Sequence, residues 1–158
     1  MTSLTSSGIS VDLPQGWEAE IYRRPEDALT FSAGRGEACH AVFHAANFPL
    51  PPERGDFGSG AVEIMRSHEV LVILFEHGPE SVGTTLFSYE GIPIPLDAAD
   101  FSPDMMQRAL VGQAGAQKFF TVNGRAFCLY VVLGSYANRQ ALVATANALL
   151  ATLDISSL

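Results

Sequence analysis

The sequence is poor in charged residues, and above all in lysine. Charged side chains make up 16% of its 158 residues, and Lys118 is the single lysine. Seventeen acidic residues against nine basic ones give a net charge of −8. No cluster of basic residues stands out, so long-range repulsion from phosphates opposes binding to nucleic acid or to an anionic membrane. We therefore expect neither of them as a partner.

Long apolar runs are also absent. No run approaches the ~20 apolar residues of a membrane-spanning helix, and the first eight residues have neither the basic region nor the apolar core of a signal peptide. These absences predict a soluble, cytoplasmic protein. Hydrophobic residues nevertheless make up 47% of the chain, which excludes disorder over most of it. We see no linker or internal repeat, so we expect one domain over residues 1–158.

Cysteine is scarce: the chain has two, Cys39 and Cys128. Both fall in segments predicted as strands, where a free cysteine behaves as a small hydrophobic residue. They would form a disulfide only if the two strands were neighbours in an oxidising compartment. Neither cysteine lies in a context that would activate a thiolate, so we expect neither to act as a nucleophile.

The clearest signal that is present predicts a β-hairpin. Asn123-Gly124 is the dipeptide that best tolerates the two positive φ angles of a type I′ turn, and apolar, β-favouring runs flank it. A two-residue turn sets Phe120 opposite Phe127. The second strand of this hairpin is apolar on both faces, so we expect it to be central in a sheet, with a layer of structure above and another below.

Similar patterns predict a helix and a second central strand. We expect Ser135 to cap a helix that runs to Leu153, because apolar residues recur along one helical stripe. Residues 70–75 are wholly apolar, which predicts a strand buried on both faces. The other predicted elements are an opening hairpin (9–13 with 17–23) whose charges suit a sheet edge, strands at 29–32, 39–48 and 84–89, and helices at about 59–67 and 102–110. Together they predict an α+β domain: a mainly antiparallel sheet with helices on both faces, an α/β/α sandwich.

Two histidines, His40 and His44, have the spacing of a metal-binding pair on a helix. In a strand, however, four residues span about 13 Å at ~3.3 Å per residue, so one ion cannot bind both imidazoles. The alternative is that they are buried or half-buried histidines with hydrogen-bond partners. We expect no metal site.

Other candidate motifs are incomplete. Residues 55–60 resemble an anion-binding loop, yet they lack the lysine of a P-loop, and Asp56 would repel a phosphate. Gly58-Ser-Gly60 is shorter than the nucleophile elbow of a hydrolase. Two pairs of neighbouring carboxylates are interpreted as solvated loop acids: Asp97 with Asp100, and Glu76 with Glu80. We therefore expect no catalytic residue and no cofactor.

Two proline-rich loops, at 49–57 and 91–101, combine a rigid backbone with apolar side chains. They are interpreted either as caps over the core or as a surface for a partner or ligand. The residues that would form this surface are Phe48, Leu50, Phe57, Ile92, Ile94, Leu96 and Phe101.

Two further patterns lie at the ends of the chain: Val11-Asp-Leu-Pro-Gln-Gly-Trp17 near the start, and a long hairpin that runs into an amphipathic helix near the end. The first looks like the opening of the PsbP-like proteins, and the second is similar to their close. The resemblance implies an antiparallel sheet between helical layers. It also implies a family whose members mostly bind other macromolecules. These members include extrinsic photosystem subunits, a Ran-binding release factor and bacterial envelope or effector-associated adaptors. The whole chain is also similar to small uncharacterised actinobacterial proteins.

The leading functional hypothesis is a non-catalytic adaptor or accessory subunit that binds another protein or a second copy of itself. It rests on the lack of clustered catalytic residues, the low charge and the rigid apolar loops. The alternative is a module for a small apolar ligand, with a pocket between the proline-rich loops and the sheet. A cavity of ~300 Å³ or more with a few polar groups would favour it. A third hypothesis, an enzyme that uses His40 or His44, would need an open cleft at one imidazole.

Overall fold

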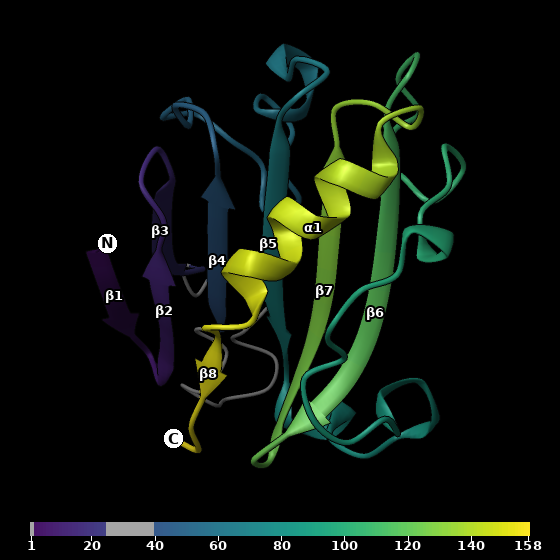
Figure 1. Ribbon diagram of the computed structural model, residues 1–158. Coiled ribbons are helices and arrows are strands. Elements are labelled where there is room, and N and C mark those ends of the chain that lie inside the picture. The colour runs from purple at the N-terminus through teal and green to yellow at the C-terminus, as the bar shows by residue number, and fades with distance from the viewer. Residues whose placement is uncertain (1, 25–39) are drawn as a thin grey trace.

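The computed structural model describes residues 2–24 and 40–158, whose strands form two antiparallel sheets (Figure 1). The larger sheet has the strand order β3-β4-β5-β7-β6, and the smaller one has the order β1-β2-β8. The strands are β1 (Thr2–Ser6), β2 (Ile9–Leu13), β3 (Glu18–Arg23), β4 (Ala41–Ala46), β5 (Val70–His77), β6 (Ala114–Val122), β7 (Arg125–Leu133) and β8 (Asp154–Ile155). One α-helix is present in the described residues, α1 (Arg139–Leu150).

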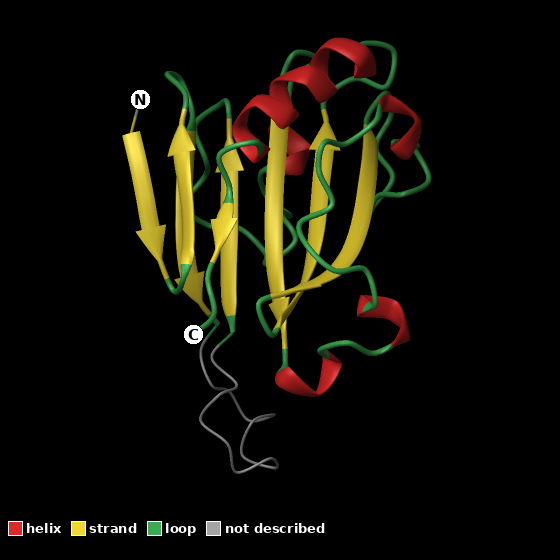
Figure 2. Cartoon of the chain, turned by 60° about the horizontal axis from the view of Figure 1, so that its bottom comes forward, coloured by secondary structure: helices red, strands yellow, loops and turns green. Residues whose placement is uncertain are grey.

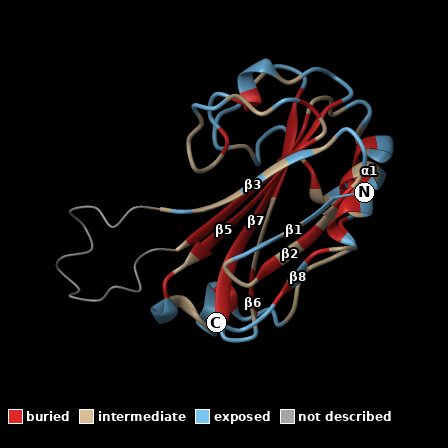
Figure 3. Cartoon of the chain, turned by 90° about the vertical axis from the view of Figure 1, so that its left-hand side faces the viewer, coloured by how far each residue is buried: buried red, intermediate tan, exposed pale blue. Residues whose placement is uncertain are grey.

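The helix α1 and the smaller sheet lie on the same side of the larger sheet. Figure 1 shows α1 crossing β5 and β7, and Figure 3, seen from the side, places α1, β1, β2 and β8 together on that side. The apolar residues between these layers form one cluster, the first core, in which Ile9 of β2, Phe43 of β4, Leu129 of β7 and Leu149 of α1 are all buried. The first core therefore joins both sheets and the helix.

The opposite face of the larger sheet is covered by irregular chain. Leu71 and Ile73 of β5 and Val132 of β7 pack there against Phe48 and Val62, and we call this cluster the second core. Residues 47–67 and 102–113 supply the cover, with a single 3-10 turn at Val62–Ile64. Figure 2 shows how much of the chain outside the strands is loop.

The predicted sandwich with helices on both faces is therefore wrong. The described chain is mostly β, with two antiparallel sheets and a single helix on one face only. The predicted helix at 59–67 is reduced to its 3-10 turn because Gly58 and Gly60, with φ of 88° and 97°, hold the backbone out of the helical region. The predicted helix at 102–110 does not form because Ser102 bridges to Gly115 of β6 through two backbone hydrogen bonds of 3.0 Å.

The central hairpin is confirmed in position and register. Val122 pairs with Arg125 and Phe120 with Phe127, across a turn in which Asn123 and Gly124 have φ of 50° and 76°. β7 lies between β5 and β6, and β5 lies between β4 and β7, so both predicted central strands are central. Every residue of β7 is buried.

The predicted opening hairpin is wrong, although both of its strands exist. β2 pairs with β1 across a turn in which Ser7 and Gly8 have φ of 54° and 76°, and on its other side it pairs with β8. β3 pairs with β4 instead, and it forms one edge of the larger sheet, as its charges predicted. The bend at residues 14–16 sends the chain from one sheet to the other because Pro14 has no amide hydrogen to donate to a ladder.

Three smaller predictions have different outcomes. The helix after the hairpin forms, but it begins at Arg139, and the Ser135 hydroxyl accepts the Asn138 amide 3.2 Å away in the turn before it. The strand predicted at 84–89 is replaced by a 3-10 turn at Thr85–Phe87. The strand predicted at 29–32 and Cys39 lie outside the described residues, and Cys128 is a buried free thiol.

Candidate functional site

The seven apolar residues predicted to form one surface are divided between the two faces of the larger sheet. Phe48, Leu50 and Phe57 pack in the second core, whereas Ile92, Ile94, Leu96 and Phe101 pack in the first core. Phe48, Leu96 and Phe101 are buried, and the other four are half-buried. The two proline-rich loops thus cover opposite faces and do not form a continuous surface.

The second of these loops is tied to the helix. The Asn147 side chain of α1 accepts a hydrogen bond from the Leu96 amide at 2.8 Å and donates one to the Leu96 carbonyl at 2.9 Å. Asp97 then begins a 3-10 turn at Ala98–Asp100, and the Asp97 and Asp100 carboxylates cap its amides. This loop closes the first core, as the capping interpretation expects.

The first loop, in contrast, borders a cavity of about 310 Å³. Its walls come from residues 55–63 on one side and from Gln107 and Arg108 on the other, and Tyr130 of β7 lies between them. The cavity therefore lies over the second core, on the face of the larger sheet opposite α1. Phe57 is the one residue of the seven that lines it.

The aromatic part of the cavity wall depends on how closely the loop approaches the sheet. The Phe57 ring stacks on the Phe75 ring of β5 with centroids 4.6 Å apart, and it meets the Tyr130 ring edge-on at 6.1 Å. Gly58 has a φ of 88°, and a Cβ atom there would lie 2.7 Å from Leu71 and 2.8 Å from Ile73. A glycine is therefore required for the loop to lie flat on β5.

Tyr130 provides the most deeply placed polar group of the cavity. Its side chain is 1% exposed, and its hydroxyl oxygen accepts a hydrogen bond from the Gln107 amide at 2.8 Å. Among the described residues no acceptor receives the hydroxyl's own proton. Burial raises the pKa of Tyr130, so the hydroxyl keeps that proton at neutral pH. The cavity thus contains a buried hydrogen-bond donor without an acceptor.

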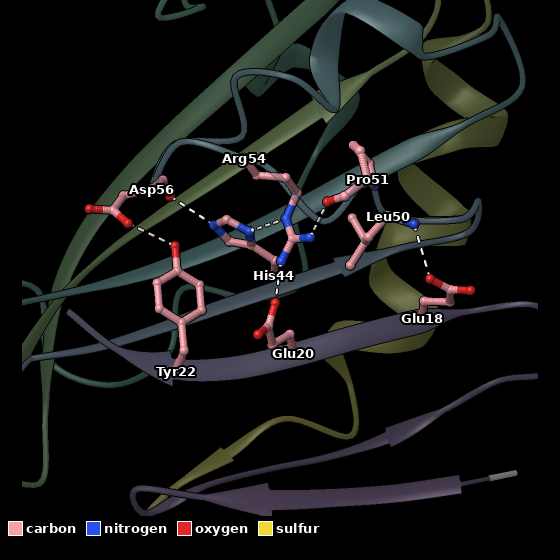
Figure 4. A network of polar contacts seen from close by, with 8 residues as sticks. All are labelled: Glu18, Glu20, Tyr22, His44, Leu50, Pro51, Arg54 and Asp56. Carbon is pink, nitrogen blue, oxygen red and sulfur yellow. Dashed lines mark hydrogen bonds and ion pairs between the residues drawn. The ribbon is translucent and has the colours of Figure 1, made fainter. Parts of the chain in front are cut away.

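A cluster of polar side chains holds the outer side of the same loop (Figure 4). His44 of β4 is fully buried, and both of its ring nitrogens are used. The Arg54 Nε donates to His44 Nδ1 at 3.0 Å, so Nε2 carries the proton and donates to the Asp56 carbonyl at 2.9 Å. His44 therefore binds the Arg54 side chain and the Asp56 backbone, on either side of Gly55.

Three more contacts belong to this cluster, two of them from β3 residues and one from a loop carbonyl. The Tyr22 hydroxyl donates to the Asp56 carboxylate at 2.7 Å, and the Arg54 guanidinium pairs with Glu20 and donates to the Pro51 carbonyl. Burial and the hydrogen bond to Asp56 raise the pKa of Tyr22, so it stays a neutral donor. We call Glu20, Tyr22, His44, Arg54 and Asp56 the loop clamp.

The chemistry of the clamp is that of a structural support. Burial lowers the pKa of His44, an effect that the hydrogen bond to the Asp56 carbonyl opposes and the Arg54 charge reinforces. The imidazole is therefore neutral at pH 7, and it is enclosed with no free nitrogen. His44 thus has no atom with which to reach a substrate or an ion.

A second cavity, of about 360 Å³, lies at the end of the hairpin, beside Asn123 and Gly124. Two of its charged side chains pair with each other: Arg125 Nε and Nη2 both donate to the Glu76 carboxylate at 2.9 Å, and the two side chains are 4% and 9% exposed. His77 also lines this cavity, and its buried Nε2 has no partner in the described residues. The interpretation of Glu76 as a solvated loop acid is therefore wrong. It lies within β5, where burial requires a partner.

Five residues of the first cavity were missed by the sequence interpretation, namely Val62, Glu63, Gln107, Arg108 and Tyr130. Tyr130 was assigned only to the dry scaffold. A signal was nevertheless present, because a tyrosine in an otherwise apolar strand needs a partner for its hydroxyl. The 102–110 segment gave no such signal, because it reads as an ordinary surface helix.

Within the described residues, no group of three histidine, cysteine, aspartate or glutamate side chains is placed to hold a metal ion. No described helix is long and apolar enough to cross a membrane. Comparison with known proteins finds no matching family model, curated protein or solved structure. The resemblance to PsbP-like proteins stays a prediction from the chain ends.

Proposed function

We propose that this protein is a small-ligand-binding module whose site is the 310 Å³ cavity between residues 55–63, residues 107–108 and Tyr130. The single observation that supports this proposal most is the cavity itself. It has the size that binding pockets typically start from, roughly 300 Å³, and it combines apolar walls with a few polar groups. It also borders the first proline-rich loop, although the second loop, which the ligand-binding alternative included, lies on the other face of the sheet.

The loop clamp supports the same proposal. A binding site keeps its affinity when its walls are held in the binding conformation before the ligand arrives. Here His44 and Tyr22 hold residues 54–56 from the side away from the cavity, through hydrogen bonds of 2.7–3.0 Å. The wall is therefore preorganised, although it has no regular secondary structure.

The uncharged dye prodan, whose fluorescence reports an apolar environment, tests this function. We expect saturable binding of one dye per chain. Gln107→Trp should weaken this binding at least about tenfold, because an indole introduced at the cavity wall occupies space that the dye needs. Gln107 suits this purpose because its side chain is exposed and the bond to Tyr130 uses its backbone amide.

The matched control is Gln140→Trp, the same substitution at an exposed position of α1, on the other face of the larger sheet. It should leave dye binding unchanged. Equal binding by both variants, or no saturable binding by the unmodified protein, would contradict the proposal.

A second candidate function is the protein-binding adaptor. Three large hydrophobic residues are exposed on the segments that wall the cavity: Ile64 and Met105 are 55% and 42% exposed, and Val111 is fully exposed. Exposed large apolar groups on neighbouring segments are a feature that interaction surfaces share. A second copy of the chain is the simplest partner for them.

Size-exclusion chromatography with light scattering tests this candidate over a range of concentrations. A dimer that dissociates when Met105 and Val111 are both changed to serine would support it. A monomer at every concentration would argue against self-association through this surface, and dye binding to that monomer would leave the cavity as the site.

A further inference from the structure

We infer that the cavity takes a flat, non-anionic molecule whose inner end carries a hydrogen-bond acceptor, such as a carbonyl oxygen or a ring nitrogen, for the Tyr130 hydroxyl. This inference rests on the proposed function and specifies the class of ligand. Three features of the cavity carry it: the unused donor on Tyr130, the arrangement of its aromatic rings and the balance of its charges.

The donor comes first because a buried hydroxyl without an acceptor costs free energy. Tyr130 is 1% exposed, and its oxygen already accepts a hydrogen bond from the Gln107 amide. The hydroxyl proton is therefore the donor that remains unused. A buried donor without an acceptor lowers stability, and a ligand that supplies the acceptor recovers that loss. The donor thus favours ligands with an acceptor over purely apolar ones of the same shape.

The rings of Phe57 and Tyr130 set the shape. They meet at an interplanar angle of 68° with centroids 6.1 Å apart, which forms an aromatic corner in the cavity wall. Stacking of Phe57 on Phe75, at 20° and 4.6 Å, holds one side of this corner in place. A flat ring can contact one face of the corner in an offset stack and the other with its edge, as aromatic pairs prefer.

The charges at the cavity exclude anions. Asp56 and Glu63 contribute two carboxylates, and Arg108 contributes the one cationic side chain of the lining. The Arg108 guanidinium lies 3.4 Å from the Glu63 carboxylate and its side chain is 73% exposed, so its charge is balanced and hydrated. A carboxylate or phosphate ligand would therefore meet net negative charge.

Three small compounds of similar size test the inference: acetophenone, which has an acceptor, ethylbenzene, which has none, and benzoate, which is an anion. Binding is followed by NMR titration of the isotope-labelled protein through the Gln107 backbone amide, which donates to the Tyr130 oxygen. We expect acetophenone and ethylbenzene to shift this resonance and benzoate to leave it unchanged. Tyr130→Phe should weaken acetophenone about fivefold and leave ethylbenzene unaffected.

Tyr89→Phe is the matched control, because Tyr89 is 56% exposed on a different loop and its hydroxyl makes no described contact with the cavity. It should change neither affinity. Equal losses of both compounds in Tyr130→Phe, or no loss of either, would overturn the inference while the proposed function stands. If benzoate bound as tightly as acetophenone, the inference that the cavity excludes anions would be overturned. If none of the compounds and no prodan bound, the proposed function itself would fail.

Discussion

At the scale of single residues, the polar groups inside the described part of this protein follow one rule with a few exceptions: most are buried together with a hydrogen-bond partner. Asn147 serves both the amide and the carbonyl of Leu96, whereas Gln113 donates to the Val62 carbonyl at 2.9 Å but its Oε1 has no partner within the part that the structure describes. Tyr130 is a further exception, like His77 Nε2, because its hydroxyl proton has no acceptor in the described part of the chain. Its place in the lining of the 310 Å³ cavity, beside the Phe57 ring, is the reason to regard that cavity as a site and not as a packing defect.

The ion pair between Glu76 and Arg125 provides a residue-scale test of the same rule. Arg125→Met should lower the free energy of unfolding by about 3 kcal/mol, because it leaves the Glu76 carboxylate buried without its cation. Urea unfolding measures this loss. The double variant Glu76→Leu with Arg125→Met should recover part of it, since no unpaired charge then remains.

Arg108→Met is the control for this test, because Arg108 makes an exposed ion pair with Glu63. It should change the free energy of unfolding by no more than about 0.5 kcal/mol. Similar losses of unfolding free energy for Arg108→Met and Arg125→Met would show that the contribution of the Glu76–Arg125 pair to stability does not depend on its burial.

At the scale of elements, the central hairpin could be predicted and the irregular cover over the second core could not. Asn123-Gly124 specifies a turn by local backbone geometry, and that turn fixes the register of the neighbouring strands. In residues 47–67 and 102–113, no local sequence motif specifies the backbone conformation in this way. Their conformations are set by contacts distant in sequence, such as Gly58 on β5 and Ser102 on β6, and a helical spacing of apolar residues within them was misleading.

The candidate site was predictable only in part for the same reason. Phe57 was identified because an aromatic residue in a proline-rich loop is conspicuous. Tyr130 was hidden among apolar neighbours, and its relation to Gln107 depends on the path of the irregular segment 102–113 that precedes β6. The pairing of β2 with β1 was missed because Ser7-Gly8 resembles any flexible terminus in sequence.

The loop clamp gives an element-scale prediction of pH dependence. The pKa of His44 in the folded protein is lower than its ordinary value of 6.5, so between these two values the unfolded chain binds more protons. The contribution of His44 to stability is therefore complete above pH 6.5 and is lost as the pH falls below it. The loss is at most about 1.4 kcal/mol per pH unit.

Protonation of His44 would place two donors, Nδ1 and the Arg54 Nε, face to face, and the nearby Glu20, Tyr22 and Asp56 are already engaged. We therefore expect amides of residues 54–58 to exchange hydrogen faster at pH 5 than at pH 7, after correction for intrinsic rates. His44→Gln should reduce this pH dependence. His77→Gln is the matched variant for the other histidine with a lowered pKa, and it should leave these amides unaffected.

At the scale of the whole molecule, the first core makes the two sheets one folding unit. Ile9 of β2 is fully buried in it, pairs with Ile155 of β8 and belongs to the same cluster as Leu129 of β7. Ile9→Ala should therefore lower the free energy of unfolding of the entire domain by about 3 kcal/mol. Trp17 fluorescence and far-ultraviolet circular dichroism should report one coincident transition.

Ile64→Ala is the control here, since Ile64 is 55% exposed. It should change the free energy of unfolding by less than about 0.5 kcal/mol. Two separate transitions in the Ile9→Ala protein would show instead that the smaller sheet unfolds independently of the larger one.

The single lysine has a practical consequence for measuring these effects. Lys118 lies on the same face of β6 as Ala116 and Phe120 of the first core and 3.0 Å from Asp100, so it is on the face opposite the cavity. Apart from the α-amino group, it is the only primary amine in the sequence with which a coupling reagent can react. A sensor chip loaded through Lys118 would hold every molecule in nearly one orientation, with the cavity turned toward the flowing solution.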